Sequence, residues 1–391
     1  YDFEPESEVL QVGADYGALT GLFRSSVRAV TVLDETESAL ETVRQRYPGA
    51  ANIYYRKDSL AGYAAEACAE GKKYDYVIFA GTLTAPYEKH IHAAKSLLKP
   101  DGILIVALAN ALGMKYFAGT VEEENALTKR QLAELLCGDK ETQSMADESG
   151  TLKFYYPMPD YKTPVSIYSD AYLPKKGDLT RVTPAYDYPP YHLMEQGEKF
   201  DTVCEAGLFD LYANSYLVFW SADPKQLQKE DERIFMKYNK TRREEFQIKT
   251  CICERNVAGA ETGNKERYVE KAALSLDGSA HIASFKEKYE KLTKQHRTLK
   301  VAEPKFAEHR NSVFFPYLVG ETCAEKLGEQ LEGGQLPLDV LQIVMNQIYD
   351  ISPECRSAFN RTEEFDEVFG ADLTEEEQKL LLSDTACEVS N

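Results

Sequence analysis

The chain has 391 residues, and its 64 acidic against 45 basic side chains give a formal net charge of −19 at pH 7. This balance argues against nucleic acid as a partner, because a broad phosphate-binding surface needs clustered lysine and arginine. The length and the 43% share of hydrophobic residues are typical of a globular protein with two or three domains. The sequence has no apolar run of about 18 residues and no leader-like start, so it predicts a cytoplasmic chain without a membrane span.

The eight cysteines are scattered and form neither a C-x-x-C pair nor the Cys/His spacing of a zinc site. The sequence therefore predicts reduced thiols and no metal centre. Cys251 and Cys253 lie two residues apart in a strand-like run, so we expect both to face one core.

Strand-like and helix-like segments alternate regularly over residues 8–108. The predicted strands are 8–12, 29–33, 52–55, 74–79 and 103–108. The predicted helices are 18–24, a segment that ends at 46, 60–70 and 90–98, and a turn is predicted at 99–102. This alternation predicts an α/β domain with a parallel sheet, whose ligands bind at the carboxyl ends of the strands.

The next part of the chain has a different character. Strands are predicted at 152–156 and 212–220, with a tyrosine- and proline-rich insertion at about 157–211 that we expect to cover a site. A charged linker is predicted at 223–242. Beyond it, strands are predicted at 245–253, 267–274 and 312–318, and helices at 282–295, 337–351 and 374–382.

The glycine turn Gly13-Ala14-Asp15-Tyr16-Gly17 after the first strand, Asp34 at the end of the second, and the strand–turn–strand pattern at 97–108 resemble the class I S-adenosylmethionine-dependent methyltransferases. The resemblance covers residues 1–222. It implies a Rossmann-like seven-stranded sheet with a terminal antiparallel hairpin made of 152–156 and 212–220. NAD binding is disfavoured, since G-x-x-x-G is not the dinucleotide pattern G-x-G-x-x-G.

The resemblance also implies S-adenosyl-L-methionine as the cofactor. Glycine would let the backbone approach the methionine part, Asp34 would bind the ribose hydroxyls, the segment after the third strand would face the adenine, and the end of the fourth strand would lie beside the methyl group. The cofactor-binding residues predicted in this way are Gly13, Ala14, Asp15, Gly17, Asp34, Glu35, Asp58, Ser59, Ala80 and Gly81. Gln11 stands at a position that is usually acidic in the family.

Segments 110–119, 154–164, 168–174 and 213–216 look like bacterial methyltransferase-like proteins associated with cell-surface polysaccharide. This resemblance implies a small-molecule or saccharide acceptor under a tyrosine-rich lid; packing of the same tyrosines on the sheet is an equal alternative. If the acceptor is a hydroxyl, a base is needed. His90 and Asp160 are the candidates, since His92 points away from His90 on a helix.

The segment Val269-Glu270-Lys271, a helix with Glu287 and Glu290, and residues 314–327 look like the small lobe and hinge of a kinase-like fold. The loop 256–263 is a poor version of the phosphate-covering loop, and no H-R-D or D-F-G sequence follows. We therefore expect residues 243–391 to be a partial kinase-like α+β domain, with a small lobe to about 330 and a helical segment after it, cut from a longer chain.

The favoured function is a S-adenosylmethionine-dependent methyltransferase that methylates an oxygen of a saccharide or of a polysaccharide precursor. The alternative is a non-catalytic, cofactor-binding scaffold in a surface-polysaccharide assembly system, with other glycan-assembly proteins as partners. RNA methylation is disfavoured by the net charge.

Overall fold

The computed structural model describes residues 3–138, 150–180, 193–229, 231–238, 241–256, 265–295, 300–306 and 311–349. Within these residues, thirteen strands form one sheet in the order β12-β13-β11-β10-β9-β7-β6-β8-β5-β4-β1-β2-β3. By its internal contacts the chain divides into two compact units, residues 1–285 with 303–318, and residues 286–302 with 319–391. The first unit contains every strand of the sheet.

The strands are β1 (Glu8–Val12), β2 (Ala29–Asp34), β3 (Ile53–Lys57), β4 (Tyr74–Ala80), β5 (Leu98–Ala109), β6 (Thr151–Met158), β7 (Ser166–Ser169), β8 (Ser215–Ser221), β9 (Asp231–Tyr238), β10 (Ile248–Asn256), β11 (Lys265–Ala273), β12 (Lys305–Phe306) and β13 (Ser312–Pro316). The α-helices are α1 (Ala18–Ser26), α2 (Glu37–Arg46), α3 (Leu60–Ala69), α4 (Tyr87–Ser96), α5 (Met114–Phe117), α6 (Lys129–Cys137), α7 (Gln196–Glu205), α8 (Phe209–Tyr212), α9 (Ser279–Gln295), α10 (Cys323–Glu332) and α11 (Leu338–Tyr349).

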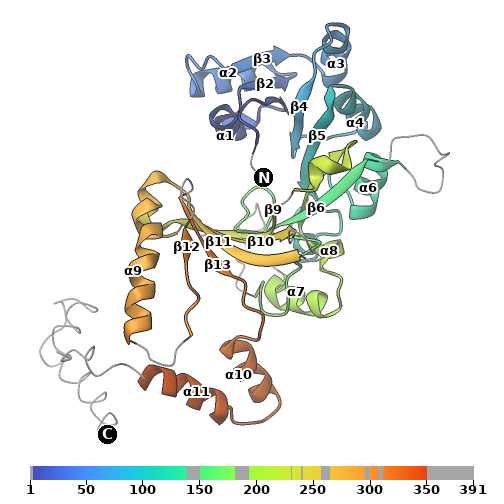
Figure 1. Cartoon of the computed structure of the whole chain (residues 1–391). Coiled ribbons are helices and arrows are strands. Elements are labelled where there is room, and N and C mark those ends of the chain that lie inside the picture. The colour runs from blue at the N-terminus through green and yellow to red at the C-terminus, as the bar shows by residue number, and fades with distance from the viewer. Residues whose placement is uncertain are drawn as a thin grey trace, which may run out of the picture. The chain divides into compact units, whose positions relative to one another are not determined.

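Strands β1 to β5 are parallel and joined by helices, which confirms the predicted Rossmann-like α/β fold. Strand β8 pairs antiparallel with β5, and β6 pairs antiparallel with β8, as the predicted terminal hairpin requires. Helices α1 and α2 cover one face of the parallel strands, and α3 and α4 cover the other (Figure 1). The inner strands β1, β4 and β5 and their neighbour β2 are mostly apolar because both of their faces are buried, whereas the edge strand β3 is largely exposed.

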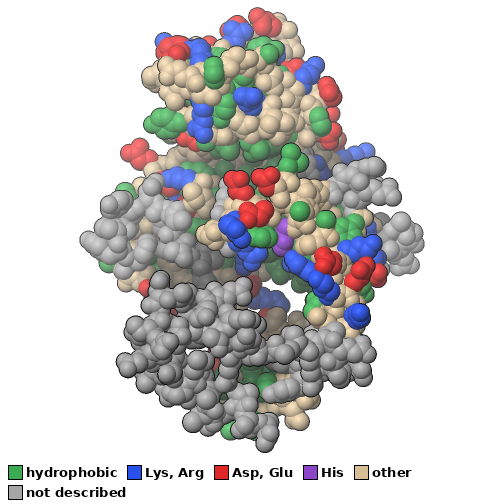
Figure 2. Space-filling model, turned by 90° about the vertical axis from the view of Figure 1, so that its left-hand side faces the viewer, with side chains coloured by type: hydrophobic (Ala, Val, Ile, Leu, Met, Phe, Trp, Pro, Cys, Tyr) green, Lys and Arg blue, Asp and Glu red, His purple; other side chains and the backbone are tan. Residues whose placement is uncertain are grey.

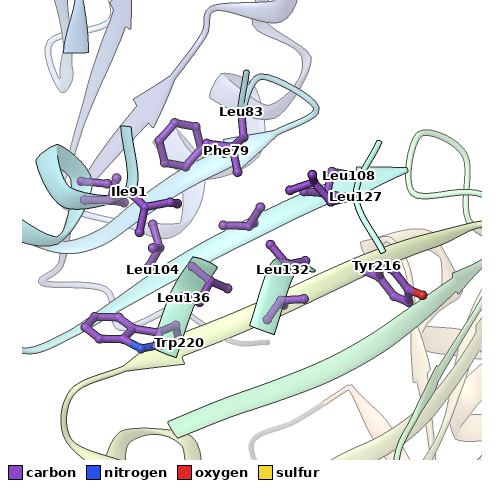
Figure 3. Packing of buried hydrophobic residues seen from close by; sticks show 14 of the residues in the cluster. Phe79, Leu83, Ile91, Leu104, Leu108, Leu127, Leu132, Leu136, Tyr216 and Trp220 are labelled. Carbon is purple, nitrogen blue, oxygen red and sulfur yellow. The ribbon is translucent and has the colours of Figure 1, made fainter. Parts of the chain in front are cut away.

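The larger core lies on the face that carries α3, α4 and α6. Leu132 and Leu136 of α6 are fully buried there, close to Trp220 of β8 and Leu104 of β5 (Figure 3). Because α6 precedes β6 in the chain, its packing on β5 and β8 holds the antiparallel hairpin against the parallel half of the sheet.

Residues 99–102, predicted as a turn, lie inside the bounds of β5. Leu98 and Ile103 pair with Tyr74 and Tyr76, so the four residues between them stand opposite Asp75 alone. The Lys99 ammonium lies 2.8 Å from the Asp75 carboxylate. The turn is therefore a bulge in a longer strand, fixed by an ion pair.

The segments predicted as insertion and linker contribute strands to the sheet. Strand β7 lies inside the predicted insertion and pairs with β6, while β9 lies inside the predicted linker and pairs with β7 and β10. A four-residue strand among prolines has too short an alternation to be recognised from sequence. Residues 181–192 of the insertion lie outside the described part.

Beyond β9 the predicted order of elements is found: β10, β11, α9 and β13 match the predicted strands and helix. Cys251 and Cys253 of β10 are both buried, as predicted. In the second unit, α10 begins with a capping box between Thr322 and Glu325, and α11 corresponds to the helix predicted at 337–351. The helix predicted at 374–382 lies outside the described residues.

The described surface carries charges of both signs. On the face shown in Figure 2, lysine and arginine side chains are interspersed with aspartate and glutamate. Attraction for a polyanion is therefore weak on the described part of this face. Within the described residues, no helix is both long enough and apolar enough to cross a bilayer.

Candidate functional site

A cavity of about 320 Å³ lies at the carboxyl ends of β1, β2, β3 and β4. Its described lining includes the carboxylates of Asp34, Glu35 and Asp58, and no lysine or arginine is among these lining residues. The full lining is Val12, Gly13, Leu33, Asp34, Glu35, Asp58, Leu60, Phe79, Thr82, Thr84 and His90. Five predicted site residues, contributed by separate segments of the chain, thus meet in one cavity: Gly13, Asp34, Glu35, Asp58 and His90.

The glycine turn is held from inside the protein. The buried Gln11 amide donates to the Gly13 carbonyl at 2.9 Å and accepts from the Thr20 hydroxyl at 2.7 Å. A carboxylate at this position could not donate to a carbonyl. The sequence marked Gln11 only as a departure from the family pattern; in the structure its amide ties β1, the turn and α1 together.

Gly13 lines the cavity, and the structure gives a steric reason for glycine in addition to the predicted one. Its φ is +90°, and a Cβ at this position would collide with the Thr82 side chain, whose hydroxyl donates to the Val12 carbonyl at 2.5 Å. The absent side chain therefore leaves room for Thr82. Gly17, with φ +78°, faces the Tyr47 ring. Ala14 and Gly17 are buried and Asp15 is exposed, and none of the three is among the residues that line the cavity.

Asp34 ties the end of β2 to the glycine turn. One carboxylate oxygen accepts from the Ala14 N–H at 2.9 Å, and the other accepts from the N–H and hydroxyl of Thr36. Partial burial raises the pKa of Asp34, but these hydrogen bonds outweigh burial and leave the pKa below its ordinary value. Asp34 is thus a fixed anion that lines the cavity, and about one of its four lone pairs is left by these three hydrogen bonds.

The neighbours Asp58 and Ser59 have different roles: Asp58 faces the cavity and Ser59 caps a helix. Asp58 lines the cavity and accepts from the Ser59 N–H at 2.7 Å. The Ser59 hydroxyl accepts from the Gly62 N–H at 3.1 Å and so caps α3. Ser59, predicted to face the ligand, thus caps the helix and is not among the residues that line the cavity.

Strand β4 ends at Ala80, Gly81 follows it, and neither residue is among those that line this cavity. Gly81 has φ +77°, and a Cβ there would lie 2.6 Å from the Tyr161 hydroxyl. The Asn125 side chain donates to the Gly81 carbonyl at 2.9 Å. Residues from the segments before and after β6 thus close against the end of β4.

His90 is the histidine that faces the cavity, while His92 is exposed. The His90 Nδ1 lies 2.8 Å from the Thr84 carbonyl, which can only accept a hydrogen bond. In the neutral ring Nδ1 therefore carries the proton, and Nε2 holds the free lone pair. His90 shares its cavity with the carboxylates Asp34 and Asp58, which places it beside the groups predicted to bind the cofactor.

Asp160 does not fit the predicted role of base. Its side chain is completely buried, and the equally buried Lys115 ammonium lies 2.6 Å from it. The second Asp160 oxygen accepts from the Lys162 N–H at 2.8 Å. An acceptor molecule has no access to a carboxylate that is enclosed and paired in this way.

Three described tyrosines of the segments predicted to form or support the lid belong to the core. Tyr156, Tyr168 and Tyr216 are buried and make edge-to-face contacts with Phe209 or with one another. Of the two alternatives, packing on the sheet describes these three rings. Tyr116 and Tyr161 remain partly exposed near the end of β4.

Thr82, Glu123 and Tyr161 were missed at the sequence level. Thr82 follows directly after a predicted strand and Ala80-Gly81, which is a usable signal for a site residue. Glu123 and Tyr161 are brought to β4 by long-range packing, and no pattern in the sequence indicates that they lie near this strand.

A second cavity, of about 330 Å³, lies between strands β6 and β8 and strands β9 to β11. Arg233 and the buried Glu270 face it as an ion pair of 3.2 Å. None of the predicted site residues lines this cavity. Lys271 lies on β11 with its ammonium over the Phe285 and Phe315 rings, and residues 257–263 of the predicted phosphate loop lie outside the described part.

No protein-family model matches the chain, and no curated protein matches it. Among solved structures, the N-methyltransferase NodS of Bradyrhizobium japonicum with S-adenosyl-L-homocysteine is 19% identical over 26% of this chain and 53% of that chain, with a TM-score of 0.24. A rRNA methylase from Streptococcus thermophilus is 19% identical over 42% and 84% of the two chains, with a TM-score of 0.29. Haemonchus contortus phosphoethanolamine N-methyltransferase 1 is 12% identical over 55% and 39%, with a TM-score of 0.32. The chain spans about half the length of NodS, and at these TM-scores the functional assignment depends on the chain's own residues.

Proposed function

We propose that the chain binds S-adenosyl-L-methionine at the carboxyl ends of β1 to β4 and transfers its methyl group to an acceptor. The observation that carries this proposal is the cavity in which Gly13, Asp34 and Asp58 meet. Asp34 is anionic and keeps about one lone pair for a ribose hydroxyl, and Asp58 offers a carboxylate to the adenine amino group.

The charge of the cavity favours a sulfonium cofactor over a dinucleotide. Asp34, Glu35 and Asp58 give its described lining three negative charges and no lysine or arginine to offset them. A pyrophosphate brought here would be repelled, whereas a positively charged sulfonium is attracted. The cavity thus supports the donor implied by the resemblance.

Methyl transfer needs the acceptor atom, the methyl carbon and the sulfur in line, so the protein acts mainly by alignment. We propose an oxygen of a saccharide, or of a saccharide precursor, as the acceptor, in a cytoplasmic surface-polysaccharide system. Support comes from the resemblance of residues 110–119 and 154–164 and from polar side chains beside Gly81, namely Asn125 and Tyr161. The buried tyrosines no longer support it.

The second candidate is a non-catalytic scaffold that combines the cofactor fold with a partial kinase-like domain. Its support is the order of β10, β11, α9 and β13, which is the order that the resemblance predicts, and the placement of Lys271 on β11. The two candidates differ in turnover and not in cofactor binding.

Isothermal calorimetry on the whole chain with S-adenosylmethionine and S-adenosylhomocysteine tests the cofactor. We expect binding by the wild type and at least tenfold weaker binding by Asp34→Asn and Asp58→Asn, which keep the shape of the side chain. Asp101→Asn, exposed at the bulge of β5 far from the strands' carboxyl ends, is the matched control. Absence of heat with both ligands in the wild type would refute the proposal.

A further inference from the structure

Five side chains around the end of β4 form a connected polar cluster. The Tyr161 hydroxyl lies against Gly81 and donates to a Glu123 carboxylate oxygen at 3.3 Å. The other Glu123 oxygen is 2.8 Å from the Lys115 ammonium, which also binds Asp160. The Lys162 ammonium lies 3.5 Å from the same Glu123 oxygen. The cluster leads from the strand end expected to lie beside the methyl donor to a fixed carboxylate.

The protonation states within the cluster follow from its charges. Burial raises the pKa of Glu123, but the hydrogen bond and charge of Lys115 and the charge of Lys162 outweigh burial, and the pKa lies below its ordinary value. Burial and the nearby carboxylates of Glu123 and Asp160 raise the pKa of Tyr161 far above its ordinary value. At neutral pH Glu123 is therefore a carboxylate and Tyr161 a neutral phenol that points its proton at Glu123.

We propose that Tyr161 and Glu123 form a proton relay for a hydroxyl acceptor. The acceptor oxygen attacks the methyl carbon, so an O–C bond forms while the C–S bond breaks and its electrons stay on sulfur. The proton of the acceptor oxygen passes to the Tyr161 oxygen as the Tyr161 proton passes to Glu123. The positive charge of the sulfonium and the negative charge of Glu123 are both consumed, so the step balances. The inference rests on the proposed function.

A weak base is adequate for this step, because an oxygen that is gaining a methyl group becomes strongly acidic. The phenol transfers one proton while receiving another, so no tyrosinate is formed. Asp160 is excluded by its burial and by Lys115, and it acts by holding Lys115 against Glu123. His90 faces the cavity of Asp34 and Asp58, where the proposed ribose and adenine contacts lie. Tyr161 contacts Gly81, at the strand end that is expected to lie beside the methyl donor. Tyr161 is therefore the catalytic residue, and Glu123 acts through it.

The test uses the full chain with S-adenosylmethionine as donor and glycerol or the methyl glycosides of mannose, glucose and galactose as acceptors. Formation of S-adenosylhomocysteine is measured for wild type, Tyr161→Phe and Glu123→Gln. The matched controls are Tyr54→Phe and Glu122→Gln, which remove an exposed hydroxyl on β3 and the exposed charge next to Glu123. Calorimetry with S-adenosylhomocysteine accompanies each variant.

We expect kcat to fall about 100-fold or more in both relay variants, with the dissociation constant of S-adenosylhomocysteine changed less than twofold and both controls unchanged. We also expect kcat of the wild type to be lower in D₂O, and this isotope effect to vanish in Glu123→Gln, a change that a purely structural role of Glu123 does not produce. Unchanged kcat in either relay variant overturns the relay. Failure of the wild type to methylate any of these acceptors while it binds the cofactor also overturns the relay and leaves cofactor binding standing. Failure to bind the cofactor refutes the proposed function itself.

Discussion

The Tyr161 side chain, from the segment after β6, packs against Gly81 at the end of the parallel strand β4. The positive φ of Gly81 and the phenol 2.6 Å from its missing Cβ act independently against any side chain. Alanine therefore meets two costs, a strained backbone of about 1–2 kcal/mol and an overpacked contact of about 1–3 kcal/mol.

Gly81→Ala is expected to lower the free energy of unfolding in urea by more than Gly207→Ala does. Gly207 also has a positive φ, +68°, but nothing lies within 4 Å of its missing Cβ, so it reports the backbone cost alone. The difference between the two variants measures the contact with Tyr161. Equal losses would show that the phenol moves away at no cost.

Lys115 is the buried charge on which Asp160 and Glu123 both depend. Lys115→Met keeps the aliphatic length but leaves the enclosed Asp160 carboxylate and the partly exposed Glu123 carboxylate without their shared ammonium, and should cost about 3–5 kcal/mol of unfolding free energy at pH 7. Arg44→Met, which breaks the exposed pair with Glu37, should cost less than about 1 kcal/mol.

The cost of Lys115→Met also depends on pH. Because the pKa of Glu123 is lowered in the folded state, the stability that this group contributes is present above its ordinary value of 4.5 and is lost as the pH falls through its folded value. The difference in unfolding free energy between the wild type and Lys115→Met should therefore become smaller below about pH 4.5. Denaturation curves at several pH values measure it, and a constant difference would contradict the assignment.

At the scale of elements, the glycine turn could be predicted from the sequence, but the contacts that stabilise it could not. Two glycines after a buried strand predicted the turn and its place at the sheet edge, because only a parallel βα unit puts such a turn there. The contacts that fix its conformation, Gln11 to the Gly13 carbonyl and Thr82 against Gly13, depend on packing between elements. Asp15 and Tyr16 adopt positive φ values of 38° and 52° without being glycine.

Gln11→Glu replaces the donor amide with an acid, which is the residue usual in the family resemblance. Here a carboxylate would face the carbonyls of Gly13 and Ala14, which lie 2.9 and 3.4 Å from the Gln11 nitrogen. We expect a loss of about 1–3 kcal/mol in unfolding free energy and weaker cofactor binding. Gln45→Glu on the exposed face of α2 should change stability by less than about 0.5 kcal/mol. An unaffected Gln11→Glu variant would mean that the turn does not need the amide.

Prediction of the fold succeeded where elements repeat locally and failed where strands meet over long distances. The units from β1 to β5 carry apolar strands and amphipathic helices, and these patterns are read within a few residues. The pairing of β7 with β9 involves residues about 70 positions apart, and β7 lies in a proline-rich segment. Its length of four residues carries no distinctive period.

At the scale of the molecule, the pairing of β7 with β9 carries one sheet across the segment predicted as a linker. Residues 1–285 and 303–318 accordingly form one compact unit. A sheet that continues through backbone hydrogen bonds should unfold as a whole, unlike two domains joined by a linker.

Ile234→Ala tests this continuity. Ile234 is fully buried in β9, and its truncation should cost about 2–5 kcal/mol. Trp220, the single tryptophan of the chain, lies in β8 and reports the other part of the sheet by its fluorescence. In Ile234→Ala we expect the unfolding midpoint measured by Trp220 fluorescence to fall by the same amount as the midpoint measured by far-ultraviolet circular dichroism. Val121→Ala, at an exposed site, is the control; a Trp220 midpoint that stays in place would favour independent domains.

The three carboxylates of the cavity also bear on how a catalytic cycle ends. S-adenosylmethionine carries one positive charge more than S-adenosylhomocysteine, because the sulfonium becomes a neutral thioether when the methyl group leaves. On the proposed function, the negative field of Asp34, Glu35 and Asp58 therefore attracts the fresh donor more than the spent product. Salt screens this preference over about 8–10 Å, so product inhibition should grow as the ionic strength rises.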